Sequence, residues 1–389
     1  MDRILVAGAS LAGLRSVESL RAHGFHGEIV AIGDEVHPPY TRPPLSKGSL
    51  TTSSPSDAVT IPHNAEATWR LGRTVVGCSL DAGRVDLDDG SSEDFDGLVI
   101  ATGLRARRLT IPGPSGGRHV LRTLDDAREL AGELRPGRTV LIVGASFIAC
   151  EVASSARARN CRVVVVAPEE NPMLRVVGAE VGAALRARHE ADGVEFHLSK
   201  LPVRFEGTDR VTGVVLDDGT ELPVDVVVEA VGCSPSVEWL AGNGLDLTDG
   251  VLCANTMRVI GADNAVAVGD VARFPNPLFD SIPRRIEHWT MAGDTADRAA
   301  GTLLGKLPDH RPFTPLPSFW SDQLGMRIQG FGAPALADEY TLVSGSLDGD
   351  FAVAGYREGT LIAVFGIGRR RDVSKLRQEL LDSAVNSTA

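Results

Sequence analysis

The fold is decided by the stretch Ile4-Leu5-Val6-Ala7-Gly8-Ala9-Ser10-Leu11-Ala12-Gly13. An apolar run passes directly into a turn that contains glycine, and Leu14, Val17 and Leu20 then form an apolar stripe at helical spacing. A second apolar run follows at residues 28–32. This order predicts a strand, a helix and a second, parallel strand.

The same unit occurs again further along the chain. An apolar run at residues 140–143 leads into Gly144-Ala145-Ser146-Phe147-Ile148-Ala149, followed by a helical stretch to about Arg159 and an apolar run at residues 162–166. We therefore expect an α/β protein with two Rossmann-like units. Two such units in one chain mean either two bound nucleotides, or one bound nucleotide and one vestigial site.

The residues of both turns suit a dinucleotide. A strand that turns at once into a helix presents backbone N–H groups and the positive end of the helix dipole to an anion. Small residues at three positions allow the tight turn, the approach of a pyrophosphate and the packing of helix on strand. These positions hold Gly8, Ser10 and Gly13 in the first copy and Gly144, Ser146 and Ala149 in the second. Each copy alone is weak evidence against an ordinary turn, but the duplication favours nucleotide binding.

Acidic residues follow the second strand of each unit differently. Asp34 and Glu35 stand where a carboxylate would bond a ribose hydroxyl, although a solvated loop charge is the alternative. In the second unit Ala167 occupies the matching place, so NADPH is not excluded there. Glu169 and Glu170 follow it and would repel a 2′-phosphate, which favours NADH.

Composition excludes several classes of protein. The 389 residues carry a formal charge of −12, which argues against nucleic acid as the main partner. No apolar run is close to the length of a membrane span, which is about 18 residues. The five cysteines include no C-x-x-C pair and the nine histidines show no ligand spacing, so we expect neither a dithiol relay nor a metal. The apolar run that begins directly after Arg3 leaves no room for a signal peptide, and we expect a cytoplasmic protein.

The segment Pro39-Tyr40-Thr41-Arg42-Pro43-Pro44-Leu45-Ser46-Lys47 resembles a signature of FAD-dependent NAD(P)H:ferredoxin reductases of the oxygenase-coupled type, the putidaredoxin reductase and dioxygenase ferredoxin reductase family. Five further segments are similar to the same family in the same order, at residues 98–103, 121–127, 267–272, 285–290 and 319–323. The resemblance covers nearly the whole chain. It implies a glutathione-reductase-like fold with two Rossmann-like nucleotide-binding domains and a C-terminal α+β domain.

The resemblance also implies the site residues. FAD would be bound by Gly8, Ser10, Gly13, Asp34, Glu35, Arg42, Lys47, Thr102, Gly103, Arg122, Gly269, Asp270, Glu287, His288 and Trp289. The nicotinamide nucleotide would be bound by Gly144, Ser146, Ile148, Glu151 and Gly232. Lys47 and Glu151 would meet beside the flavin, with Trp320 at its edge, and these three are the expected catalytic residues. The plainer alternatives are an interdomain salt bridge for Lys47 and Glu151, a core position for Trp320 and a helix N-cap for Asp270.

The resemblance implies transfer of a hydride from NAD(P)H to FAD, and then of single electrons to an iron–sulfur ferredoxin that feeds a cytochrome P450 or a dioxygenase. The run 39–47 contains no cysteine, which favours an external acceptor over a disulfide or peroxide. Three arginine-rich stretches, at residues 105–108, 284–285 and 369–371, are candidate docking sites for an acidic ferredoxin or simply solvated faces. Two other functions stay open: a diverged flavoprotein redox sensor or interaction protein with weak NAD(P)H turnover, and a flavin oxidoreductase acting directly on a small molecule.

We expect four segments in the domain organisation. Residues 1–112 and 243–314 would form the FAD-binding domain, residues 113–242 the NAD(P)H-binding domain, and residues 315–389 the C-terminal interface domain. Alternating apolar residues at 351–356 and 361–365 predict antiparallel strands in the last domain, before a helix from about Val373.

Overall fold

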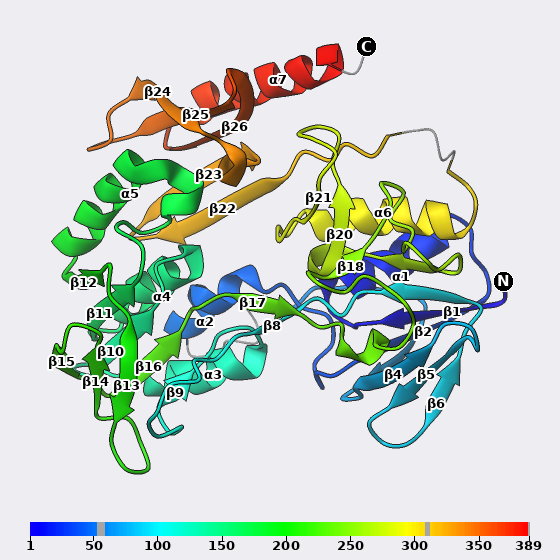
Figure 1. Ribbon diagram of the computed structural model, residues 1–389, viewed down its shortest axis with the longest axis horizontal. Helices are drawn as coiled ribbons and strands as arrows, with labels where there is room; N and C mark the ends of the chain where they lie inside the picture. Colours follow the sequence, from blue (N-terminus) through cyan, green and yellow to red (C-terminus); the bar gives the residue numbers. More distant parts are fainter. Residues whose placement is uncertain (53–58, 308–311, 388–389) are drawn as a thin grey trace. The chain divides into compact units, whose positions relative to one another are not determined.

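A computed structural model describes residues 1–52, 59–307 and 312–387 of the chain (Figure 1). It divides into two compact units. Unit 1 comprises Met1–Thr41, Thr60–Arg105 and Ser234–Pro317, and unit 2 comprises Arg42–Val59, Ala106–Cys233 and Ser318–Ala389. The limits of the functional domains remain a prediction. Residues 308–311, just before the expected boundary between residues 243–314 and 315–389, lie outside the described residues.

Unit 1 is built on a five-stranded parallel sheet in the order β19-β7-β1-β2-β3. The strands are β1 (Arg3–Ala7), β2 (Glu28–Gly33), β3 (Thr68–Leu71), β7 (Gly97–Ile100) and β19 (Ala265–Ala267). Helices α1 (Leu11–Ala22) and α6 (Met291–Leu303) contact each other. The first expected strand–helix–strand unit is therefore present as β1, α1 and β2.

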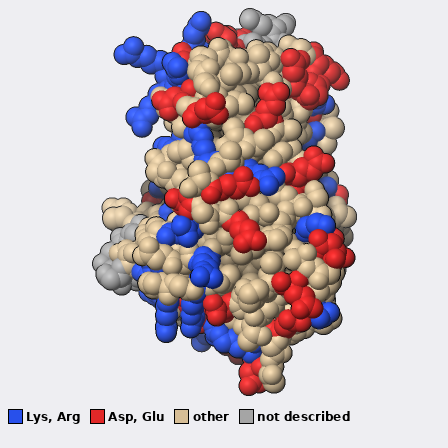
Figure 2. Space-filling view, turned by 90° about the vertical axis from the view of Figure 1, so that its left-hand side faces the viewer, with Lys and Arg blue, Asp and Glu red and all other residues tan. Residues whose placement is uncertain are grey.

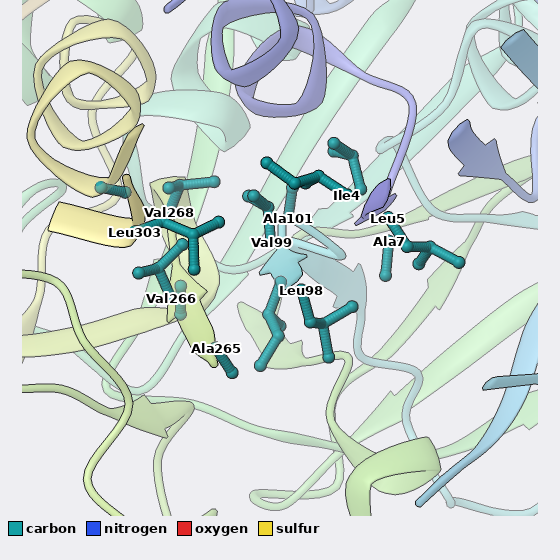
Figure 3. Packing of buried hydrophobic residues seen from close by; sticks show 14 of the residues in the cluster. Ile4, Leu5, Ala7, Leu98, Val99, Ala101, Ala265, Val266, Val268 and Leu303 are labelled. Atoms are coloured by element: carbon teal, nitrogen blue, oxygen red, sulfur yellow. The ribbon is translucent and has the colours of Figure 1, made fainter. Parts of the chain in front are cut away.

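The core of unit 1 explains why its strands are apolar on both faces. Side chains from β1, β7 and β19 pack together, with Leu303 of α6 beside them (Figure 3). Each fully buried Ile, Leu or Val contributes about 1.5–3 kcal/mol to stability. This packing fixes the carboxyl ends of the three strands at one edge of the sheet.

Smaller elements complete unit 1. Two three-stranded sheets have the orders β4-β5-β6 and β18-β20-β21. Their strands are β4 (Val75–Ser79), β5 (Arg84–Leu87), β6 (Ser92–Asp94), β18 (Val251–Leu252), β20 (Ala272–Pro275) and β21 (Pro283–Arg285). The 3-10 helices are η2 (Glu238–Leu240) and η3 (Gly269–Val271). Strands β8 (Leu104–Ala106) and β17 (Cys233–Pro235) lie where the chain passes from one unit to the other.

Unit 2 repeats the parallel design in the order β12-β11-β10-β16-β9. These strands are β9 (Arg118–His119), β10 (Thr139–Val143), β11 (Arg162–Ala167), β12 (Val194–Leu198) and β16 (Val226–Glu229). A three-stranded antiparallel sheet contains β13 (Pro202–Glu206), β14 (Gly213–Leu216) and β15 (Glu221–Pro223). The helical elements are η1 (Pro43–Ser46), α2 (Gly48–Thr51), α3 (Leu124–Glu133), α4 (Phe147–Ala158) and α5 (Leu174–Ala191). The second expected nucleotide unit is present as β10, α4 and β11.

The C-terminal part of unit 2 is a five-stranded antiparallel sheet in the order β22-β23-β26-β25-β24. It contains β22 (Ser318–Gln323), β23 (Met326–Gly332), η4 (Pro334–Leu336), β24 (Glu339–Gly345), β25 (Phe351–Arg357), β26 (Thr360–Ile367) and α7 (Arg370–Ser387). The two expected antiparallel strands are confirmed as β25 and β26. The final helix begins at Arg370 rather than Val373, because the chain turns at Gly368 (φ +68°) and exposed arginines are good helix formers in the first turn.

Candidate functional site

The first glycine loop, in unit 1, has no room for side chains at two positions. Gly8 has φ +118°, and a Cβ there would lie 2.2 Å from the carbonyl oxygen of Ala101. A Cβ on Gly13 would lie 1.9 Å from the carbonyl oxygen of Gly8. Ser10 is the N-cap of α1, its side chain makes no capping bond, and the first helical turn contains no acidic residue. The helix N-terminus is thus built to receive an anion such as a pyrophosphate.

The two acidic residues after β2 have different surroundings. Asp34 is exposed, and its Oδ1 accepts a hydrogen bond from the backbone N–H of Glu35 (3.0 Å). Glu35 is partly buried, and its Oε2 accepts from the Tyr40 hydroxyl (2.5 Å). Both carboxylates follow the carboxyl end of a strand beside β1, where a ribose hydroxyl would be bound.

Two further strand ends bring predicted residues to the same edge of this sheet. Thr102 and Gly103 follow β7, and the Thr102 hydroxyl donates to the carbonyl oxygen of Ser236 (2.7 Å). Gly269 and Asp270 follow β19, which is paired in parallel with β7. Asp270 lies within η3, whose N-cap is Val268, so the alternative of a helix N-cap for Asp270 is wrong.

The segment before α6 supplies Glu287, His288 and Trp289. The indole Nε1 of Trp289 donates to the Thr41 hydroxyl (3.1 Å), and Glu287 accepts from the guanidinium of Arg285 (2.6 Å). Burial lowers the pKa of His288 to about 4, against an opposing effect of the Asp270 carboxylate. His288 is therefore neutral at pH 7.

The second glycine loop, in unit 2, is more open than the first. Gly144 has φ +110°, and a Cβ there would lie 2.4 Å from the carbonyl oxygen of Ala230. Ala149 is fully buried at the position of the third glycine. Ser146 is exposed at the N-cap of α4, and Ile148 exposes 43 % of its surface. Gly232 follows β16, the strand next to β10, and a Cβ there would meet nothing within 4 Å. The loop leaves space beside it for a nucleotide.

Lys47 and Glu151 are brought together within unit 2. The Lys47 ammonium lies 2.6 Å from Glu151 Oε2, and it also donates to the carbonyl oxygen of Pro43 (3.1 Å). The Glu151 carboxylate is 2 % exposed and accepts from the hydroxyls of Ser46 and Ser321, each at 2.5 Å. The salt bridge of the plainer interpretation is thus present, and both of its residues belong to unit 2. The role of the pair beside a flavin remains a proposal.

Two other predicted residues of unit 2, Arg42 and Trp320, lie near this pair. Arg42 shortly precedes Lys47 in the sequence, and Trp320 precedes Ser321, which donates to Glu151. Arg42 donates to the carbonyl oxygen of Arg122 (2.6 Å), just before the capping box that starts α3. Trp320 lies on β22 next to Ser321 and is partly buried, with the guanidinium of Arg327 5.7 Å from its ring centroid. Trp320 is therefore not a fully buried core residue.

Sequence reasoning did not single out three buried polar residues of unit 2: His189, Ser321 and Gln323. A signal was available for two of them. Ser321 and Gln323 alternate along β22, so they share one face of the strand, and both are buried. Two polar side chains on a buried strand face need polar partners.

The three basic stretches differ in how their charges are compensated. In the first, Arg105 pairs with Glu238. In the second, Arg284 pairs with Asp280 (2.5 Å), and Arg285 pairs with Asp249 (2.8 Å) and with Glu287. By contrast, the side chains of residues 369–371 are exposed on unit 2. Figure 2 shows basic and acidic side chains interspersed on one face of the molecule. The side chains of Arg107 and Arg108 in the first stretch are exposed as well, so residues 284–285 are the weakest of the three candidates for electrostatic docking.

All five cysteines are free thiols, and three of them are buried. Burial raises the pKa of Cys150 and Cys253 to about 12. In the part of the chain that the structure describes, no cluster of three or more His, Cys, Asp or Glu side chains is arranged to hold a metal ion. Over the same residues, no helix has both the length and the apolar character needed to cross a membrane.

A duplicated glycine-loop unit followed by a C-terminal antiparallel sheet is the arrangement expected of an oxidoreductase that uses two nucleotides. The chain belongs to the pyridine nucleotide-disulphide oxidoreductase family, which residues 2–296 match, and residues 318–389 match the reductase C-terminal family. It is an FAD-dependent oxidoreductase that uses NAD(P)H. The glycine loops fit these nucleotides, since each pairs a position closed to a Cβ with a helix N-terminus.

Named relatives span nearly the whole chain. It is 34 % identical to the anthranilate 1,2-dioxygenase system ferredoxin–NAD(+) reductase component of Burkholderia cepacia, over 99 % of this chain and 95 % of the relative. The solved ferredoxin reductase of the CYP199A2 system from Rhodopseudomonas palustris is 32 % identical, with a TM-score of 0.92 over 98 % of this chain and 95 % of that one. The covalent putidaredoxin reductase–putidaredoxin complex gives 30 % identity and a TM-score of 0.91, over 98 % and 93 %. The predicted fold class and family are confirmed.

Proposed function

We propose that the protein is an NAD(P)H:ferredoxin reductase that passes electrons to an iron–sulfur ferredoxin serving an oxygenase, a cytochrome P450 or a dioxygenase, in the cytoplasm. Its similarity to reductase components of such systems extends over the C-terminal sheet as well as both nucleotide units. Five free cysteines agree with a reducing compartment.

The observation that carries the proposal is a family fold in which the segment 39–47, which carries Lys47, contains no cysteine. Members of this family that act on disulfides need a reactive thiol near the flavin. Here Ser46 and Lys47 stand beside Glu151, and the cysteine next to Glu151 in the sequence, Cys150, is fully buried with a raised pKa. A buried thiol of high pKa is a poor nucleophile. Electrons must therefore leave to an external acceptor.

The residues of the chain bind and orient the cofactors rather than supply acid–base groups. When bound, FAD accepts a hydride from NAD(P)H and releases single electrons. The glycine loops at Gly8 and Gly144 would hold the two pyrophosphates at the N-termini of α1 and α4. Lys47, held by Glu151 and by the carbonyl oxygen of Pro43, places a fixed positive charge in unit 2. A charge held in place costs no reorganisation during the reaction.

The end of β11 favours NADH over NADPH. A 2′-phosphate is bound by a basic side chain near this strand end. Ala167 stands there, and its carbonyl oxygen accepts a hydrogen bond from the backbone N–H of Lys200 (3.1 Å). The ammonium of Lys200 is already paired with Asp218 (2.9 Å). Glu169 adds a negative charge close by.

The first test is anaerobic stopped-flow mixing of the purified protein with NADH and, separately, NADPH, following flavin absorbance. We expect fast bleaching with NADH and slower bleaching with NADPH. Reduction of cytochrome c should then require an added ferredoxin. Tight FAD with no bleaching by either nucleotide would overturn the proposal and favour a redox sensor. Reoxidation by a small organic substrate without ferredoxin would favour the direct oxidoreductase.

A second test concerns docking of the ferredoxin. Substituting glutamate at Arg369, Arg370 and Arg371 should raise KM for ferredoxin several-fold and leave hydride transfer to a dye unchanged. Turnover with ferredoxin should fall as salt rises, while the dye reaction changes little. Equal salt responses of the two reactions would exclude electrostatic docking. Glutamate at Arg284, which is already paired with Asp280, is the matched control.

A further inference from the structure

A continuous chain of buried hydrogen bonds runs from the Lys47–Glu151 pair through β22 to α5, entirely within unit 2. The Ser321 hydroxyl donates to Glu151 Oε1 (2.5 Å), and Gln323 Nε2 donates to the Ser321 hydroxyl oxygen (3.0 Å). His189 Nε2 lies 2.6 Å from Gln323 Oε1. The side chains of Glu151, Ser321, Gln323 and His189 each expose no more than 2 % of their surface.

The direction of every bond in this chain is fixed by Glu151. An ionised carboxylate can only accept, so the Ser321 hydroxyl must donate to it. The oxygen of Ser321 then accepts from the amide N–H of Gln323, which leaves the amide oxygen to accept from His189 Nε2–H. The flipped amide would require Ser321 to donate to Gln323 and would remove its hydrogen bond from Glu151. All donors therefore point toward the carboxylate.

The far end of the chain is a neutral imidazole. Nδ1 of His189 is buried and has no hydrogen-bond partner among the described residues. Burial lowers the pKa of His189, opposed by the bond to Gln323 and by the Asp192 carboxylate. The second amide hydrogen of Gln323 faces the Met173 sulfur (3.8 Å). The imidazole is thus the Nε2–H tautomer, and it orients the amide.

The chain transmits orientation and not protons. A proton relay needs groups that accept at one atom and donate from the same atom or its tautomer. The amide of Gln323 has a fixed acceptor and a fixed donor, so it interrupts any such relay. What it delivers to Glu151 is a set of aligned dipoles, and bonds aligned in this way reinforce one another at low dielectric.

We propose that Ser321, Gln323 and His189 are positioning residues that hold the Glu151 carboxylate and, through it, the charge that the Lys47–Glu151 pair presents to the flavin. This inference rests on the proposed function, which puts the pair beside the flavin. Removal of a donor from Glu151 leaves more negative charge on its carboxylate. Reduction of a flavin adds electrons, so it becomes less favourable when nearby negative charge increases.

The test is the midpoint potential of the bound flavin, measured by equilibration with a redox dye under chemical reduction. Ser321→Ala and Gln323→Met should each lower the equilibrium constant for reduction about three- to tenfold, which is about 14–30 mV for a two-electron couple. The double variant should match Ser321→Ala alone, because Gln323 acts only through Ser321. Ser321→Thr keeps the hydroxyl and should restore the wild-type potential.

Ser154→Ala is the matched control. Ser154 lies on α4 with Glu151, and its hydroxyl accepts from the backbone N–H of Leu324 (2.8 Å) at the end of β22. Ser154→Ala removes a hydrogen bond between α4 and the end of β22 but none from the Glu151 carboxylate. The equilibrium constant for flavin reduction in Ser154→Ala should stay within twofold of the wild-type value.

Unchanged potentials in Ser321→Ala and Gln323→Met, or additive shifts in the double variant, would overturn the inference. If all the variants fail to fold, the chain is purely structural and the inference fails as well. The dye titration uses no nicotinamide, so it reports on the chain even if NADH and NADPH do not reduce the flavin and the proposed function fails. Imidazole ¹⁵N resonances give a further readout without flavin: His189 should be the Nε2–H tautomer in the wild type and lose that preference in Gln323→Met.

Discussion

Replacement of Gly8 by alanine tests whether the first loop is closed to side chains. The φ of +118° is costly for any residue with a Cβ, by about 1–3 kcal/mol. The new Cβ would also stand 2.2 Å from the carbonyl oxygen of Ala101, a backbone atom that cannot rotate away. Overpacking of this kind costs about 1–3 kcal/mol. We expect Gly8→Ala to lose about 2–6 kcal/mol of stability and most of its bound FAD.

The assay is urea unfolding followed by circular dichroism, with flavin content measured by absorbance after purification. Gly132→Ala is the control, because Gly132 lies inside α3 and a Cβ there would meet nothing within 4 Å. Alanine at that position should stabilise by about 0.5–1 kcal/mol. A Gly8→Ala protein with wild-type stability and a full complement of FAD would refute the reasoning.

Three further predictions concern buried groups. Arg118→Met should lower the free energy of unfolding in urea by about 3–5 kcal/mol, because it leaves the buried Glu229 carboxylate, now 2.6 Å from the guanidinium, without its ion-pair partner. A loss below about 1 kcal/mol would contradict this. The pKa of His288 is about 4 in the folded protein against 6.5 ordinarily, so its contribution to stability, at most about 3 kcal/mol, is present above pH 6.5 and lost as pH falls through about 4. A pH titration of unfolding should show this slope, and His288→Gln should flatten it. Cys150 and Cys253 should resist iodoacetamide at pH 8 until the protein is unfolded, as mass spectrometry of the modified peptides would show.

The sequence allowed the nucleotide units to be predicted because their signal is local. Apolar runs, a turn and a helical stripe follow one another within about thirty residues, and periodicity reads such units well. The juxtaposition of Lys47 and Glu151 is not local, and it was anticipated only through the resemblance to known reductases. The structure places their charged atoms 2.6 Å apart.

Pairings between distant segments could not be predicted from spacing. Arg284 and Arg285 form a basic pair in the sequence, yet Asp280, Asp249 and Glu287 compensate them in the structure. Periodicity along a single strand or helix says which face a residue occupies and not what lies opposite. His189 likewise reaches Gln323 across 134 residues of sequence.

The two glycine loops differ in a way that matches the tasks proposed for them. In the first, Gly13 is required because a Cβ would meet the carbonyl oxygen of Gly8 at 1.9 Å, so helix and loop are in direct contact. In the second, Ala149 fits at the corresponding position, Ile148 is exposed and the space beside Gly232 is open. A cofactor that stays bound gains from a closed, fully formed site, because it has to bind only once. A co-substrate that leaves in every catalytic cycle needs a site that it can enter and vacate quickly. The alanine in the second loop is therefore compatible with turnover, and the loop need not be vestigial.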